Sequence, residues 1–111
     1  QSLTELLKEL KSQGKRIIGY GAPAKGNTLL NYFKIGPELL EYVVDDSSWK
    51  QGLYTPGMRL PVVSSEKISK NKPDYILILA WNFADPIMKK LSWFSEKGGK
   101  FIIPVPEPKI I

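Results

Sequence analysis

The residues with the clearest chemical potential follow the first predicted strand and form a glycine-rich segment. Gly19 and Gly21 are followed by Gly26, with Lys25 directly before it. In a dinucleotide fold such glycines allow a tight turn and the close approach of a phosphate, although Ala24 holds the third glycine position of G-x-G-x-x-G here. Lys25 falls in the first turn of the next predicted helix, where the dipole disfavours a cation unless an anion lies between them. The segment predicts a phosphate site; the alternative is a tight turn that binds nothing.

Acidic and aromatic residues stand at the ends of two other predicted strands. Asp45 and Asp46 end the second strand, where an acid in a Rossmann unit holds a ribose hydroxyl; turn formation is the alternative. Trp81 and Asn82 follow a continuous apolar strand. A Trp and an Asn at such a position can stack on a base or sugar and hydrogen-bond to it. The alternative is a Trp that packs under a loop.

Composition narrows the chemistry that this chain can perform. There is no Cys and no His among the 111 residues, so disulfides, thiolate metal sites and the common nucleophile–base pairs are excluded within it. Asp, Glu, Lys and Tyr remain for catalysis, but no pattern singles one out, and we assign no catalytic residue and no metal ligand. The net charge of +5 comes from scattered lysines and describes a slightly basic surface rather than a nucleic-acid interface. No apolar run approaches the ~20 residues of a membrane span, and we expect a cytoplasmic protein.

The elements that must position these residues follow from hydrophobic periodicity. Helical spacing covers residues 2–14, 23–36, 64–70 and 85–97, and buried strands are predicted over 16–20, 41–46, 60–63, 75–80 and 101–103. This alternation predicts one α/β domain over residues 1–111. The expected fold is a Rossmann-like three-layer αβα sandwich with a mostly parallel five-stranded sheet in the order 3-2-1-4-5.

The predicted topology also indicates where a ligand would lie. Ligands of such folds bind beyond the carboxyl ends of the strands, at the point where the strand order reverses. Here that point lies between the first and fourth strands, so residues 21–27 and 81–83 are expected to face one crevice. The polar loop 47–57, which contains Tyr54 and Thr55, either covers a ligand or makes turns.

Several strings, in order along nearly the whole chain, closely resemble one protein family. They are Gly19-Tyr20-Gly21-Ala22-Pro23-Ala24-Lys25-Gly26-Asn27-Thr28, Val43-Val44-Asp45-Asp46, Lys50-Gln51-Gly52-Leu53-Tyr54-Thr55-Pro56-Gly57, Lys72-Pro73-Asp74-Tyr75, Ala80-Trp81-Asn82-Phe83-Ala84 and Ile103-Pro104-Val105-Pro106. Together they resemble the C-terminal domain of the S-adenosylmethionine-dependent sugar C-methyltransferases. One departure is Pro86, where an acid such as Glu is expected; the first turn of a helix tolerates proline.

The resemblance implies a larger polypeptide with divided tasks. In the family, a zinc-binding N-terminal segment precedes a middle domain that binds S-adenosylmethionine and supplies the catalytic residues, and the Rossmann-like C-terminal domain helps to bind a nucleotide-linked keto-sugar. A base removes a proton next to the sugar ketone, and the enolate takes the methyl group. This chain matches the last part. We therefore expect the zinc and S-adenosylmethionine to bind in the upstream segments, and we expect no zinc site in this chain. The expected partners are the nucleotide-linked sugar and the upstream domain, and the apolar end at Ile110 and Ile111 also suggests excision from a longer chain.

Carried onto this sequence, the resemblance implies a sugar-nucleotide site, with Lys25 at the pyrophosphate. The candidate substrate-binding residues are Gly21, Ala22, Pro23, Lys25, Asn27, Tyr54, Thr55, Trp81 and Asn82. Two alternatives stay open. One is a regulatory domain that binds NAD or coenzyme A, indicated by Gly19, Gly21 and Asp45. The other is a non-catalytic interaction domain, indicated by the apolar C-terminal end and the amphipathic first helix.

Overall fold

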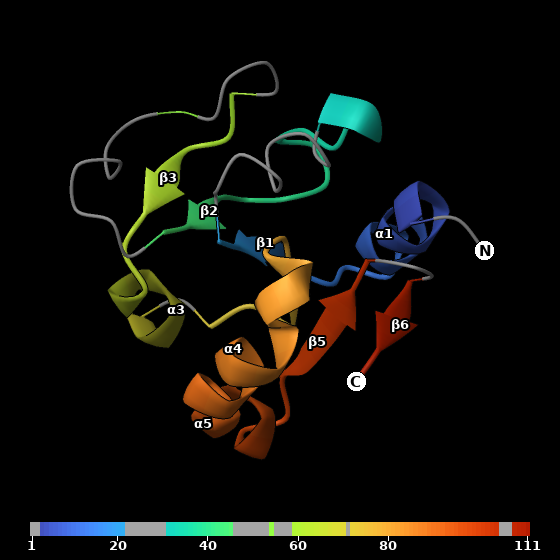
Figure 1. Cartoon of the computed structure of the whole chain (residues 1–111). Coiled ribbons are helices and arrows are strands. Elements are labelled where there is room, and N and C mark those ends of the chain that lie inside the picture. The colour runs from blue at the N-terminus through green and yellow to red at the C-terminus, as the bar shows by residue number, and fades with distance from the viewer. Residues whose placement is uncertain (1–2, 22–30, 46–53, 55–58, 71, 105–107) are drawn as a thin grey trace.

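The computed structural model describes residues 3–21, 31–45, 54, 59–70, 72–104 and 108–111 (Figure 1). Its helices are α1 (Leu3–Ser12), α3 (Glu66–Lys70), the 3-10 turn η2 (Trp81–Phe83), α4 (Ala84–Lys90) and α5 (Ser92–Glu96). Its strands are β1 (Ile17–Tyr20), β2 (Val43–Val44), β3 (Val62–Val63), β4 (Tyr75–Ile78), β5 (Lys100–Ile103) and β6 (Lys109–Ile110). The predicted α/β class is confirmed.

One sheet runs through the domain in the order β3-β2-β1-β4-β5-β6. The first five strands are parallel and keep the predicted order, which is also confirmed. The sixth strand was not predicted. It pairs antiparallel with β5, and the Phe101 and Ile111 backbones exchange hydrogen bonds of 3.0 and 2.8 Å beyond it. Lys109 and Ile110 follow a proline-rich segment and are too few to show the two-residue periodicity of a strand. They form a strand because the outer side of β5 is available for pairing.

The sheet is buried on both faces, as its apolar strands require. Successive residues of β1 belong to different cores: Ile17 packs in the cluster that contains α1, and Ile18 in the cluster that contains α3, α4 and α5. Figure 1 shows α1 apart from the group formed by α3, α4 and α5. The two-residue period of a strand therefore divides one apolar run between two helical layers.

The helix predicted over residues 85–97 is two helices. The break lies at Leu91, which has φ −101° and ψ 24°. Leu91 and Phe94 are both buried in the same cluster, so three- and four-residue spacing continues across the break. The spacing of apolar residues alone cannot reveal a break of one residue, because the apolar side chains before and after it still point to the same side.

An ion pair lies at the amino-terminal ends of the strands, where β1, β2 and β4 begin, and it connects the segments that precede β1 and β2. The Arg16 guanidinium donates two hydrogen bonds of 2.8 Å to the Glu41 carboxylate, in a bidentate geometry. The Arg16 backbone N–H donates to the Asp74 carboxylate at 2.8 Å. One residue before β1 thus ties the segments that lead into both neighbouring strands. Within the described residues, no helix has the length and apolarity to cross a membrane.

Candidate functional site

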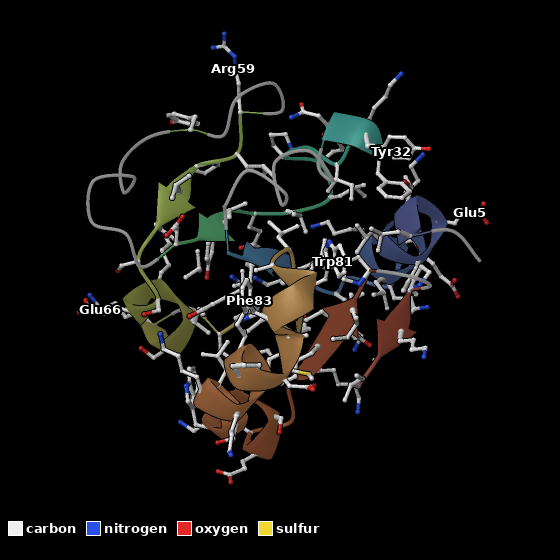
Figure 2. All side chains as sticks on the ribbon, in the orientation of Figure 1. Glu5, Tyr32, Arg59, Glu66, Trp81 and Phe83 are labelled. Carbon is white, nitrogen blue, oxygen red and sulfur yellow. The ribbon has the colours of Figure 1, made fainter. Side chains whose placement is uncertain are left out.

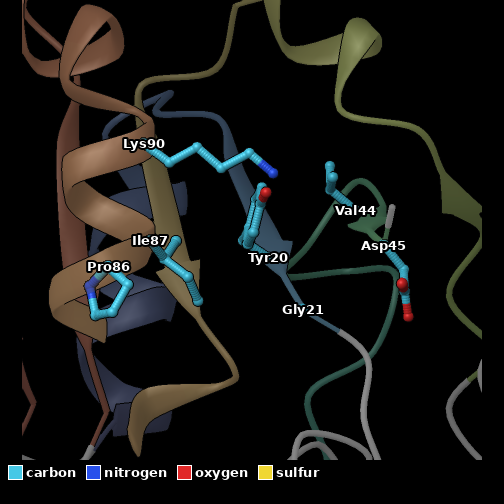
Figure 3. A pocket seen from close by; sticks show the side chains of 7 residues that line it. All are labelled: Tyr20, Gly21, Val44, Asp45, Pro86, Ile87 and Lys90. Carbon is cyan, nitrogen blue, oxygen red and sulfur yellow. The ribbon is translucent and has the colours of Figure 1, made fainter. Parts of the chain in front are cut away.

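A pocket of about 310 Å³ lies at the carboxyl ends of β1 and β2, closed on one side by α4 (Figure 3). Its lining residues are Tyr20, Gly21, Val44, Asp45, Pro86, Ile87 and Lys90. This volume is at the lower end of the range for small-molecule sites. The carboxyl edge of the sheet is where the topology predicts a ligand, but the pocket lies over β1 and β2 rather than between β1 and β4.

Backbone hydrogen bonds between neighbouring strands fix the positions of the pocket residues that come from β1 and β2. The Gly21 N–H donates to the Val44 carbonyl at 2.7 Å, and the Asp45 N–H donates to the Val63 carbonyl at 3.0 Å. Gly21 has φ +86°, a conformation that side chains disfavour, so a glycine is needed where the chain leaves β1. The Gly21 N–H is committed to the sheet, and this residue therefore shapes the pocket through its backbone path rather than by donating to a ligand.

Gly19, the first glycine of the predicted phosphate loop, has a different role. It lies inside β1, and a Cβ built there would stand 2.9 Å from Leu79 Cδ1 and 3.4 Å from Leu40 Cδ1. Both leucines are buried in the cluster around α1. Gly19 is therefore required for close core packing and is not among the residues that line the pocket.

The opposite side of the pocket comes from α4. Pro86 and Ile87 precede Lys90 by four and three residues, so all three share one face of the helix. Pro86 is the third residue of α4, where its missing N–H costs no intrahelical bond. Lys90 ends the helix, a position where the dipole favours a cation. Figure 3 shows its side chain extended toward Tyr20 on the strand side.

The pocket combines groups suited to binding a polar ligand that carries both an anionic group and hydroxyl groups. Lys90 supplies a positive charge, Asp45 a carboxylate and Tyr20 a hydroxyl, while Val44 and Ile87 add apolar surface. Among the described residues, no group of His, Cys, Asp or Glu side chains could hold a metal ion. Away from the pocket, burial raises the pKa of Tyr42 to about 12.

The structure brings few of the predicted site residues into this pocket. Gly21 lines it. Ala22, Pro23, Lys25, Asn27 and Thr55 lie outside the described residues, as does the side chain of Asn82. Tyr54 is 65% exposed and bridges Pro61 at the far edge of the sheet. Trp81 is 37% exposed in η2, and neither aromatic residue is among those that line the pocket.

Sequence reasoning missed Tyr20, Pro86, Ile87 and Lys90. The signal in α4 was present, because Pro86, Ile87 and Lys90 have helical spacing. The apolar spacing of Ile87 and Leu91, however, is equally typical of a helix face that packs on the core, as both residues also do. Only the packing of α4 across the ends of β1 and β2 separates the pocket face from the core face.

Comparison with known proteins agrees with these observations. Residues 1–106 match the family described as C-methyltransferase C-terminal domain. The chain is 41% identical over 109 residues to the C-methyltransferase NovU of Streptomyces niveus, an alignment that covers 98% of this chain and 26% of that protein. The chain thus spans about a quarter of the length of this relative. The chain therefore belongs to the C-methyltransferase C-terminal domain family.

Proposed function

We propose that this chain binds a nucleotide-linked keto-sugar for a sugar C-methyltransferase. The observation that carries the proposal is the pocket at the carboxyl ends of β1 and β2, which pairs a lysine on one wall with a carboxylate on the other. Such a sugar has a diphosphate for the cation and ring hydroxyls for the carboxylate. At about 310 Å³ the pocket holds part of so large a ligand, so the remainder extends beyond it.

Each wall has a distinct task in this proposal. The Lys90 ammonium contacts the diphosphate, and such charge-assisted hydrogen bonds are stronger than hydrogen bonds between neutral groups. Asp45 accepts hydrogen bonds from sugar hydroxyls, and the Tyr20 hydroxyl donates a hydrogen bond to the ligand. The apolar contacts come from Val44 and Ile87. Lys25, outside the described residues, remains a second candidate for the diphosphate.

The chemical step belongs to the upstream part of the proposed enzyme. Because the chain has no Cys or His, it cannot form the family's cysteine zinc site or supply a histidine base. S-adenosylmethionine, when bound upstream, supplies the methyl group. A base removes the proton next to the sugar ketone, and the enolate carbon takes that methyl. The present residues hold the sugar nucleotide in place for this reaction.

An NMR titration of the chain with thymidine diphosphate, NAD and S-adenosylmethionine tests the proposal. We expect thymidine diphosphate to shift the signals of Gly21, Asp45 and Lys90 selectively. Lys90→Met should weaken that binding about 10- to 150-fold, because a charged hydrogen bond contributes roughly 1.5–3 kcal/mol. Lys89→Met is the matched control, since Lys89 is the adjacent lysine of α4 and does not line the pocket. Equal losses in the two variants would point to overall charge instead.

A second candidate ligand is NAD or another adenine nucleotide. It is favoured by Asp45, which follows β2 and lines the pocket together with Gly21, as the ribose-binding acid of a Rossmann unit does. The same titration separates the two. Tighter binding of NAD than of thymidine diphosphate, with the largest shift at Asp45, would favour a nucleotide-binding regulatory domain.

A further inference from the structure

Phe83 occupies a position that local preferences disfavour. It is the N-cap of α4 and makes no side-chain capping hydrogen bond, at a position where Ser, Thr, Asp and Asn are preferred. Its side chain is also 60% exposed, so it contributes little to the core. Figure 2 shows it beside the first turn of α4. Residues that break local rules without a gain in packing are expected at functional sites.

The register of α4 places Phe83 next to the pocket wall. Phe83 is the N-cap and Pro86 is the third residue of α4, and the side chains at these two positions are neighbours where a helix begins. Pro86, Ile87 and Lys90 form the α4 wall of the pocket. Phe83 therefore extends this wall by one turn, beyond Pro86.

Trp81 does not share this register. It lies two residues before Phe83 in η2, and residues two apart on a helix do not face the same side. Its side chain is 37% exposed, less than that of Phe83. Of the two aromatic residues at the carboxyl end of β4, Phe83 is the one in line with the pocket wall.

We propose that Phe83 is the stacking surface for the planar base of the nucleotide whose diphosphate lies at Lys90. This inference rests on the proposed nucleotide-sugar function and deepens it. Seven residues of helix separate Phe83 from Lys90 by about 10 Å along the axis, so the α4 face contacts the base at one end and the phosphates at the other. Because every base has a π-face, stacking supplies affinity without selecting the base.

The first test measures the affinity of the chain for thymidine diphosphate and uridine diphosphate by calorimetry. Phe83→Ala should weaken both by a similar factor, about 5- to 150-fold, and Phe83→Trp should retain binding. Tyr32→Ala is the control, because Tyr32 is 79% exposed at a site outside the pocket. In the wild-type complex the base protons should show an upfield ring-current shift, which Phe83→Ala removes.

A second readout separates ligand stacking from a structural role. Phe83→Ser offers a hydroxyl acceptor at the N-cap of α4, so we expect the Tm to be unchanged or raised by a few degrees while nucleotide affinity falls. A lowered Tm, or wild-type affinity in Phe83→Ala, would overturn the stacking role and leave the nucleotide-sugar function standing. Absence of nucleotide binding by the wild-type chain would instead overturn both proposals.

Discussion

Replacing Tyr42 with phenylalanine should stabilise this protein. Tyr42 directly precedes β2, is only 4% exposed, and packs in the cluster of α3, α4 and α5. Its hydroxyl oxygen is buried and has no hydrogen-bond partner in the described part of the chain. The ring itself is well placed, since the Lys67 ammonium lies 5.6 Å from its centroid. The ring therefore contributes to packing, while the hydroxyl lost its water contacts without replacement.

The expected gain follows from the cost of that hydroxyl. Burying a hydroxyl without a hydrogen bond costs about 1–3 kcal/mol in protein mutational data. Tyr42→Phe removes the oxygen and keeps the ring, so we expect the free energy of unfolding at neutral pH to rise by about 1–2 kcal/mol. For a chain of this size that corresponds to a Tm higher by roughly 4–8 °C.

Alkaline pH should widen the difference between the two proteins. Burial raises the pKa of Tyr42 from 10.0 to about 12, so above pH 10 the unfolded chain loses this proton while the folded chain keeps it. The wild type therefore holds its full stability below the unfolded pKa and loses it as the pH rises toward the folded pKa. At pH 11 the loss amounts to about 1 kcal/mol. Tyr42→Phe has no such proton.

Urea unfolding at pH 7 and pH 11, followed by circular dichroism, measures both effects. The other titrating groups cancel when the wild type and the variant are compared at one pH. Tyr32→Phe serves as the control, because its side chain is 79% exposed and surface substitutions stay within about 0.5 kcal/mol. If Tyr42→Phe is less stable than the wild type at pH 7, the hydroxyl has a partner and the reasoning is wrong.

Two other predictions concern stability. Glu41→Gln should lower it by about 1 kcal/mol at pH 7, a small value because both partners are about one-third exposed. The Arg16 hydrogen bond lowers the pKa of Glu41. The extra stability of the wild type is therefore present above the ordinary pKa of 4.5 and disappears as the pH falls through the lowered pKa. Unfolding measured over an acid pH series checks this, and a stability difference between the two proteins that stays the same at low pH would contradict it. Gly99→Ala should cost about 1–3 kcal/mol or more in urea unfolding, since its Cβ would lie 2.4 Å from the buried Phe94 ring. Gly98→Ala, where φ is +91° with open space around the Cβ, should cost about 1 kcal/mol from backbone strain alone, and equal losses would argue against the steric cause.

The general fold was predictable because its signals are local. Continuous apolar strands such as residues 75–78 alternate with helices of three- and four-residue spacing, and right-handed crossovers leave few strand orders. The loop glycine Gly21 and the acid Asp45 were identified for the same reason, because each directly follows a strand. The resemblance to sugar C-methyltransferases was readable from ordered strings, and the family match over residues 1–106 confirms the family.

The rest depends on contacts between segments that are distant in sequence. Lys109–Ile110 becomes a strand because it pairs with the outer side of β5. The Tyr42 hydroxyl is buried without a hydrogen bond because of the residues that surround it in the cluster of α3, α4 and α5. No spacing rule joins Lys90 to Asp45, since the two meet at one pocket only when α4 packs over the ends of β1 and β2. The sequence by itself determined the five parallel strands, their order and the family. The tertiary structure decided which side chains line the pocket, because burial and proximity arise only when the elements pack together.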